Sequence, residues 1–191
     1  MSLRGNMYES NIKNIISGNE QLADFWGNSH GWAPNSAADL MSKSRLDWQV
    51  SLSKTLPKWT FDQATYDGEL ILAWANLGAL VEGSLKLLLS VYFEDYSGDV
   101  DKLKGRKGKQ VDPDALAIEK LKQFFKKKEL LKEWFPYIDL VQQRRNAIHA
   151  YKDRPIGDHN EFREAVGLYL QLLRTINRML PYPDNMYEPQ F

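Results

Sequence analysis

Apolar side chains recur every three or four residues over a long stretch in the middle of this chain, and this period constrains the fold more than any other feature. The stretch runs from about Phe61 to Tyr96. The residues that keep the period are Leu70, Trp74, Leu77, Val81, Leu85, Leu88 and Tyr92. Because this spacing places side chains on one face of an α-helix, we predict a single long helix with that face in the core.

The sequence gives no indication of a β-hairpin. The dipeptides that favour tight hairpin turns do not occur between alternating apolar runs, and Asp67-Gly68 opens onto helical spacing instead. The chain has 191 residues, which is enough for one domain with a substantial core. We therefore predict an all-α fold, a single-domain helical bundle.

Further helices are expected on both sides of the long one. The expected elements are short helices over Glu9–Gly27, a helix over Ala37–Leu56 that Pro57 ends, a loop over Ser97–Pro113, a basic amphipathic helix from there to about Lys128, a helix over Tyr137–Tyr151 and a final helix over Asp158–Leu180. Asp158 stands three residues before Glu161, close to a capping box. We expect residues 1–60 to form an N-terminal helical extension packed on the bundle, 61–181 the helical core and 182–191 a C-terminal tail.

Composition indicates the compartment. The chain contains no Cys, which excludes disulfides and thiolate metal sites and fits a reducing compartment. It also contains no run of eighteen or more apolar residues, and residues 1–8 lack the layout of a signal peptide. We expect a cytoplasmic protein without a membrane span.

The charges balance overall but not locally. Lys and Arg number 25 and Asp and Glu number 25, so the net charge is zero, which argues against a strong delocalised affinity for nucleic acid. Between Asp101 and Lys132, however, eleven basic residues face five acidic ones. This segment is either a solvated loop and helix face or a strip that contacts phosphates.

The densest group of functional side chains lies in the stretch Gln143–Tyr151, which reads QRRNAIHAY. On a helix, Arg145 and His149 are one turn apart on the same face. Arg144 lies on another side of the helix from His149, unless the helix ends or unwinds there. A polar pocket is therefore expected near this helix end.

Arg144, four intervening residues and His149 match the Arg-X4-6-His motif of HEPN domains, and Tyr151 completes the frequent His-X-Tyr ending. The sequence resembles this family over about Phe61 to Leu180, with Glu82 in the place of an inward-facing acid on a long helix. The resemblance implies a HEPN-type bundle with additional N-terminal helices that forms a homodimer. It also implies a composite, metal-independent site that cleaves RNA.

The resemblance assigns the catalytic roles to Arg144 and His149, and supporting or RNA-binding roles to Glu82, Arg145, Asn146 and Tyr151. RNA cleavage needs a base for the ribose 2′-hydroxyl, an acid for the leaving oxygen and positive charge beside the phosphorane. An imidazole with a pKa of about 6.5 and a guanidinium supply these groups. One departure is that Arg145 stands where the family commonly has a polar residue such as Asn.

Each of these residues also has a structural interpretation. His149 could cap carbonyls at a helix end, and Glu82 could pair with Lys86 one turn further on. Tyr151 could be a core or interface aromatic, and Arg145 a solvated charge or an interface salt bridge. The sequence leaves these alternatives open.

Other kinds of site are not supported. The three His residues show no metal-ligand spacing, and we interpret His30 and His159 as structural. Gly105–Lys109 is glycine-rich and basic but lacks the spacing of a phosphate-binding loop. We expect neither a metal nor another cofactor.

Three functions remain open at this point. The first is a HEPN-type RNA-directed protein, a ribonuclease of the toxin or phage-defence kind that an inhibitory partner protein could restrain. The second is a non-catalytic HEPN module that binds a nucleotide or RNA or serves in assembly, which the zero net charge and Arg145 favour. The third is a helical interaction domain whose six Trp and nine Tyr build core and subunit contacts.

Overall fold

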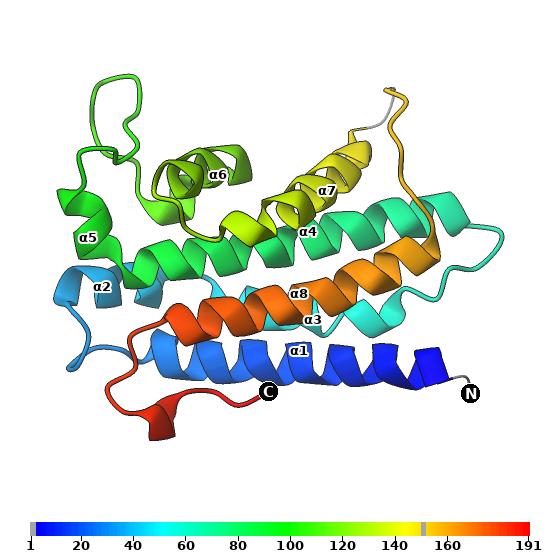
Figure 1. Ribbon diagram of the computed structural model, residues 1–191, viewed down its shortest axis with the longest axis horizontal. Helices are drawn as coiled ribbons and strands as arrows, with labels where there is room; N and C mark the ends of the chain where they lie inside the picture. Colours follow the sequence, from blue (N-terminus) through cyan, green and yellow to red (C-terminus); the bar gives the residue numbers. More distant parts are fainter. Residues whose placement is uncertain (1–2, 150–151) are drawn as a thin grey trace.

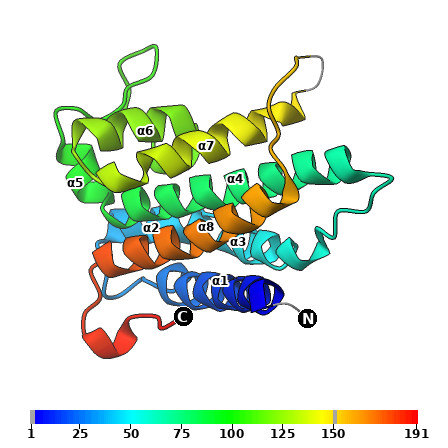
Figure 2. The same cartoon turned by 45° about the vertical axis from the view of Figure 1, so that its right-hand side comes forward.

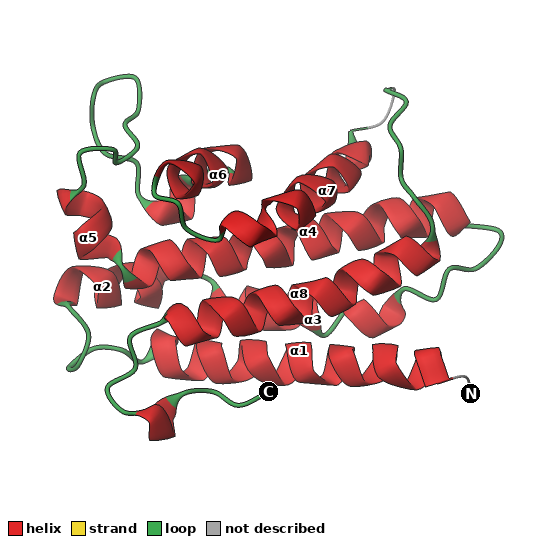
Figure 3. Cartoon of the chain, in the orientation of Figure 1, coloured by secondary structure: helices red, strands yellow, loops and turns green. Residues whose placement is uncertain are grey.

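The computed structural model describes residues 3–149 and 152–191, and these residues form an all-α bundle (Figure 3). No strand occurs in these two ranges beyond one isolated bridge between Lys104 and Gln110. The α-helices are α1 (Leu3–Gly27), α2 (Asn35–Lys43), α3 (Leu46–Ser53), α4 (Tyr66–Val91), α5 (Phe93–Gly98), α6 (Ile118–Lys127), α7 (Phe135–Arg145) and α8 (His159–Met179). The prediction of an all-α helical bundle is confirmed.

Helix α4 is the centre of the bundle. It contacts α7 on one side and α8, α3 and α2 on others, while α1 packs along α8 and α3. Figures 1 and 2 both show α6 and α7 on the side of α4 that faces away from α1. The N-terminal helix therefore closes one side of the bundle and α7 lies against the other.

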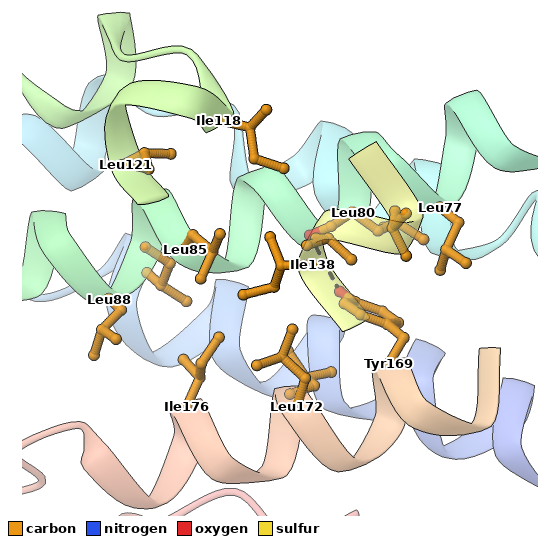
Figure 4. Packing of buried hydrophobic residues seen from close by; sticks show 14 of the residues in the cluster. Leu77, Leu80, Leu85, Leu88, Ile118, Leu121, Ile138, Tyr169, Leu172 and Ile176 are labelled. Carbon is orange, nitrogen blue, oxygen red and sulfur yellow. Dashed lines mark hydrogen bonds between the residues drawn. The ribbon is translucent and has the colours of Figure 1, made fainter. Parts of the chain in front are cut away.

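The apolar period that predicted α4 faces the core. Its members from Leu70 to Leu88 are buried, and only Tyr92, which follows the helix, is half-buried. Figure 4 shows Leu80 and Leu85 of this helix packed among side chains of α7 and α8, including Ile138 and Ile176. Each such side chain contributes about 1.5–3 kcal/mol on burial, which makes α4 the main support for its neighbours.

The N-terminal segment differs from the prediction of short helices. Residues Leu3–Gly27 form one continuous helix that runs through Gly18. A Cβ at Gly18 would lie 2.6 Å from the ring of Phe191, so this glycine makes room for the C-terminal residue rather than ending a helix. Packing against the tail and α8 thus overrides the local weakness at this residue.

The helix expected over Ala37–Leu56 is interrupted. The backbone at Ser44 is extended, and its amide and hydroxyl both donate to the carbonyl of Leu40, which closes α2 before α3 begins. The long predicted helix is also shorter than Phe61–Tyr96. It begins at Tyr66 and ends at Val91, and the chain then turns into α5.

The final helix begins as predicted. Asp158 is its N-cap, and Oδ1 of this residue accepts hydrogen bonds from the amides of Asn160 at 2.8 Å and Glu161 at 2.9 Å. The helix expected over Tyr137–Tyr151 instead begins at Phe135 and ends at Arg145, where a short 3-10 turn (Asn146–Ile148) follows. This early end determines the position of the motif side chains.

By length and apolar composition, α4 is one helix that is able to cross a membrane. In the bundle, 61% of its most apolar window is buried. Core helices of globular domains satisfy the same two criteria. The feature therefore does not by itself indicate a membrane protein.

Candidate functional site

A hollow of about 380 Å³ lies between α4 and the C-terminal end of α7, and we call it the α7 hollow. Its lining residues are Ala75, Ala79, Glu82, Gly83 and Lys86 from α4, and Arg145, Asn146, Ile148 and His149 from the end of α7 and the turn after it. Four of the six residues proposed from the sequence therefore lie together here. They are Glu82, Arg145, Asn146 and His149.

Glu82 is the acidic group that lines the α7 hollow. Its Oε2 accepts a hydrogen bond from Nη1 of Arg145 at 2.7 Å, and its Oε1 lies 3.0 Å from Nζ of Lys86. The side chain is only 18% exposed. Glu82 thus pairs with Lys86, as one interpretation of the sequence expected, and also with Arg145.

The pKa of Glu82 reflects two opposed effects. Burial favours the neutral acid and by itself raises the pKa, but the hydrogen bonds and charges of Arg145 and Lys86 outweigh it and leave the pKa below its ordinary value. The carboxylate is therefore ionised at neutral pH. It neutralises one of the two permanent cations that line the α7 hollow.

Helix α4 has a glycine, Gly78, where the side chain of Arg145 crosses it. A Cβ at Gly78 would lie 2.5 Å from Cδ of Arg145 and 2.9 Å from its Cβ. Only a glycine therefore lets the arginine stem lie flat on α4 while its guanidinium reaches Glu82. The position of Arg145 follows from this close approach of α7 to α4.

Arg144 lies outside the α7 hollow. Its guanidinium donates to both carboxylate oxygens of Glu161, at 2.8 and 3.2 Å from Nη2, and to the carbonyl of Pro155 at 2.7 Å from Nη1. The side chain is 14% exposed. Arg144 thus joins the end of α7 to the start of α8 and to the loop between them.

His149 is exposed at the end of the short turn that follows α7. Its amide donates to the carbonyl of Asn146 at 3.2 Å, which closes the turn and keeps the residue beside the hollow. Asn146 is half-buried and forms the C-cap of α7. Tyr151, the last residue of the proposed set, lies outside the described residues.

The structure adds partners that the sequence analysis did not assign. Glu161 was interpreted only as part of a helix cap, yet its carboxylate binds Arg144. Lys86 was considered only as a partner of Glu82, yet it also lines the α7 hollow. No local pattern relates Glu161 to Arg144, since the two residues are separated by a loop.

The other two histidines each have a hydrogen-bond partner outside the α7 hollow. Nε2 of His30 lies 3.0 Å from Oδ1 of Asp39, and Nδ1 of His159 lies 3.2 Å from the hydroxyl of Tyr66. Within residues 3–149 and 152–191, no three His, Asp or Glu side chains gather as a metal site would need.

The chemistry available in the α7 hollow is that of anion recognition. It contains two permanent cations, one carboxylate and an exposed imidazole, and guanidinium and ammonium groups bind phosphate oxygens. The imidazole of His149 adds ring nitrogens that can donate or accept a hydrogen bond beside these charges. Comparisons of the chain with protein-family models, with curated proteins and with solved structures find no match.

Proposed function

We propose that this chain is a cytoplasmic HEPN-type protein that acts on single-stranded RNA as a homodimer, with metal-independent endoribonuclease activity. The observation that supports this most strongly is that Arg145 and His149 share one open hollow with Glu82. A basic group for phosphate and a titratable group for proton transfer are thus beside each other on the surface.

The roles in this proposal follow from which side chains line the α7 hollow. His149 is exposed and takes the proton of the ribose 2′-hydroxyl or gives one to the leaving oxygen. Arg145 and Lys86 contact the phosphate. Arg144 is a positioning residue, because its guanidinium is bound to Glu161 and Pro155.

Dimerisation supplies what one subunit lacks. General acid–base cleavage uses two proton-transfer groups, and one subunit brings a single imidazole to the α7 hollow. Two hollows that face each other across a twofold axis would contain two histidines and two arginines. A ribonuclease of this kind fits a toxin or phage-defence role in which an inhibitory partner protein covers the site.

A second candidate is a non-catalytic module that binds a nucleotide or RNA through the same hollow. The observation in its favour is that all three nitrogens of the guanidinium of Arg144, the arginine of the family motif, already donate to groups of its own subunit. Such a module would bind the same ligands and leave them intact.

The decisive experiment compares the wild-type protein with His149→Ala on mixed single-stranded RNA in the presence of a chelator. We expect the wild-type protein to shorten the RNA over time and His149→Ala to leave it intact. His30→Ala is the matched control, because His30 is also exposed but lies away from the α7 hollow beside Asp39. This control should cleave at the wild-type rate.

Each outcome separates the two candidates. Cleavage that His149→Ala retains would come from a contaminant or another site and would contradict the assignment. Binding without cleavage by the wild-type protein would favour the non-catalytic module.

A further inference from the structure

A second and larger pocket lies beside the α7 hollow, and we call it the α3 pocket. It has a volume of about 450 Å³ and lies between α4 and the segment that joins α2 to α3. Gly83 and Lys86 line both cavities. The two cavities therefore adjoin at these two residues of α4.

The charged groups of the α3 pocket favour an anion. Lys43, Arg45 and Lys86 line it, and Asp114 is the acidic residue among its lining side chains in the described part of the chain. Arg45 also forms a two-pronged ion pair with Asp47, at 2.6 and 2.8 Å, so part of its charge is already compensated. Lys86 is paired with Glu82 in the same way, so Lys43 is the cation best placed for phosphate.

The same pocket presents an aromatic ring to solvent. Trp48 is 58% exposed, although large apolar side chains are usually buried. The guanidinium of Arg45 lies over its ring, 4.0 Å from the centroid, in a cation–π contact that holds the indole in place. An exposed, fixed aromatic ring next to cations is the combination that binds single-stranded nucleic acid by base stacking.

The floor of the α3 pocket is fixed by buried polar contacts. Nε2 of Gln49 donates to the carbonyl of Leu80 at 2.7 Å, and the hydroxyls of Ser84 and Tyr169 share a hydrogen bond of 3.0 Å. Gly83 is required here, since a Cβ on it would lie 2.2 Å from Oε1 of Gln49. Helix α3 is thus locked onto α4, and Trp48 is held on a rigid element.

We propose that the α3 pocket is a second RNA-binding subsite for the strand whose reacting phosphate lies at His149. A nucleobase of that strand stacks on Trp48, and the phosphates between the two cavities contact Lys86 and Lys43. This inference rests on the proposed function and adds to it a substrate class, a single strand long enough to fill both cavities. It also assigns α2 and α3 a role in binding.

The test measures binding of 2′-O-methyl RNA, which has no 2′-hydroxyl proton and so is not cleaved by this chemistry. The probes are a fluorescein-labelled dinucleotide and a labelled strand of about ten nucleotides, a typical length for single-strand sites. For Trp48→Ala we expect the long strand to bind about five- to hundredfold more weakly and the dinucleotide to bind unchanged. Tyr187→Ala removes a similarly exposed aromatic, at 51%, that lines neither cavity, and this variant should bind both probes normally.

A charge variant gives an independent measurement if Trp48→Ala folds poorly. Lys43→Glu should weaken binding of the long strand, whereas Lys120→Glu, at an exposed lysine outside both cavities, should change it much less. A thermal melt of each variant shows whether the fold is intact.

The results of these measurements are separable. If the wild-type protein binds neither probe, the proposed function fails together with this inference. If it binds the long strand and Trp48→Ala binds it equally well, only the subsite is wrong. If Trp48→Ala weakens the binding of both probes equally, the proposal of a strand that bridges the two cavities is wrong. It is also wrong if free adenosine monophosphate binds tightly at Trp48.

Discussion

Arg144 and Arg145 are neighbours in the sequence but pair with carboxylates on different helices. Consecutive residues at a helix end point about 100° apart, so one guanidinium reaches Glu161 of α8 and the other reaches Glu82 of α4. The sequence motif pairs Arg144 with His149. The structure instead places Arg145 in the same hollow as this histidine.

We predict that Arg144 and Glu161 are coupled in stability. Removing either partner leaves a poorly solvated charge, so Arg144→Ala and Glu161→Gln should each lower the free energy of unfolding by about 1–3 kcal/mol. The double variant should lose clearly less than the sum of the two. Urea unfolding of the four proteins measures the coupling, and strictly additive losses would contradict it.

The lowered pKa of Glu82 predicts how its contribution depends on pH. A carboxylate with a lowered pKa in the folded state stabilises the fold above its ordinary value of 4.5, and this stabilisation is lost as the pH falls through the lowered pKa. Glu82→Gln should therefore be less stable than wild type at pH 7 by roughly 1 kcal/mol. The gap should close as the pH falls below about 4.

Urea unfolding of both proteins at several pH values tests this prediction, because the difference between them removes the effect of the other carboxylates. A gap that stays constant down to the acid limit would show that the pairing with Arg145 and Lys86 does not stabilise the ionised form.

At the scale of the helices, replacing two glycines of α4 by alanine should have opposite effects on stability, because α7 approaches α4 closely at only one of them. Gly78→Ala adds a Cβ 2.5 Å from Cδ of Arg145, so it should lower the melting temperature and disturb the α7 hollow. Gly68 lies in the first turn of the same helix, and a Cβ added there would meet nothing within 4 Å. Gly68→Ala should therefore raise stability by up to about 1 kcal/mol.

Thermal melts of the two variants check this prediction. If both variants are stabilised to the same extent, α7 moves away from α4 without loss of stability, which would contradict the prediction.

The helices that the sequence predicted well are those whose packing follows their own period. The face of α4 and the start of α8 at Asp158 depend on residues close together in the chain. The break at Ser44 depends on a local side-chain hydrogen bond to Leu40, four residues back, which the apolar period does not show. The continuity of α1 through Gly18, by contrast, depends on the distant tail. Contacts between distant residues are what a local period cannot report.

The candidate site shows the same limit. The stretch around His149 and the acid at Glu82 could be proposed from the sequence, and both line the α7 hollow. Which arginine lies beside them depends on where α7 ends. The spacing predicted a helix that continues to Tyr151, but α7 ends at Arg145. The α3 pocket could not be proposed from the sequence. Residues of both α3 and α4 line it, and these two helices are separated by a loop in the chain and meet only in the fold.

At the scale of the whole molecule, the balanced charge predicts a weak salt dependence of RNA binding. In the basic segment from Asp101 to Lys132, Lys127 and Lys128 already pair with acids at 2.6 Å. The proposal gives the strand about three contacts to phosphate, from Arg145, Lys86 and Lys43, so log K against log salt should have a slope of roughly −2. Titrations of the uncleaved long strand in increasing KCl measure it. A slope steeper than about −5 would mean that the basic segment binds the strand.

The arrangement of exposed apolar residues predicts where two copies of the molecule meet. Ile148, 45% exposed, lines the α7 hollow, and Leu72, 50% exposed, lies on α4 one turn before Ala75 and the rest of the hollow's lining. If the homodimer brings two hollows together, Ile148→Glu and Leu72→Glu should each convert it to a monomer and abolish cleavage. A charge buried in a subunit interface without a partner is strongly unfavourable.

Leu168→Glu is the matched control on α8, where the residue is 44% exposed and lines neither cavity. Light scattering over a dilution series measures the mass of each variant. A monomeric wild-type protein that still cleaves RNA would show that one α7 hollow is sufficient, and His149 would then need a second proton-transfer group from within its own subunit.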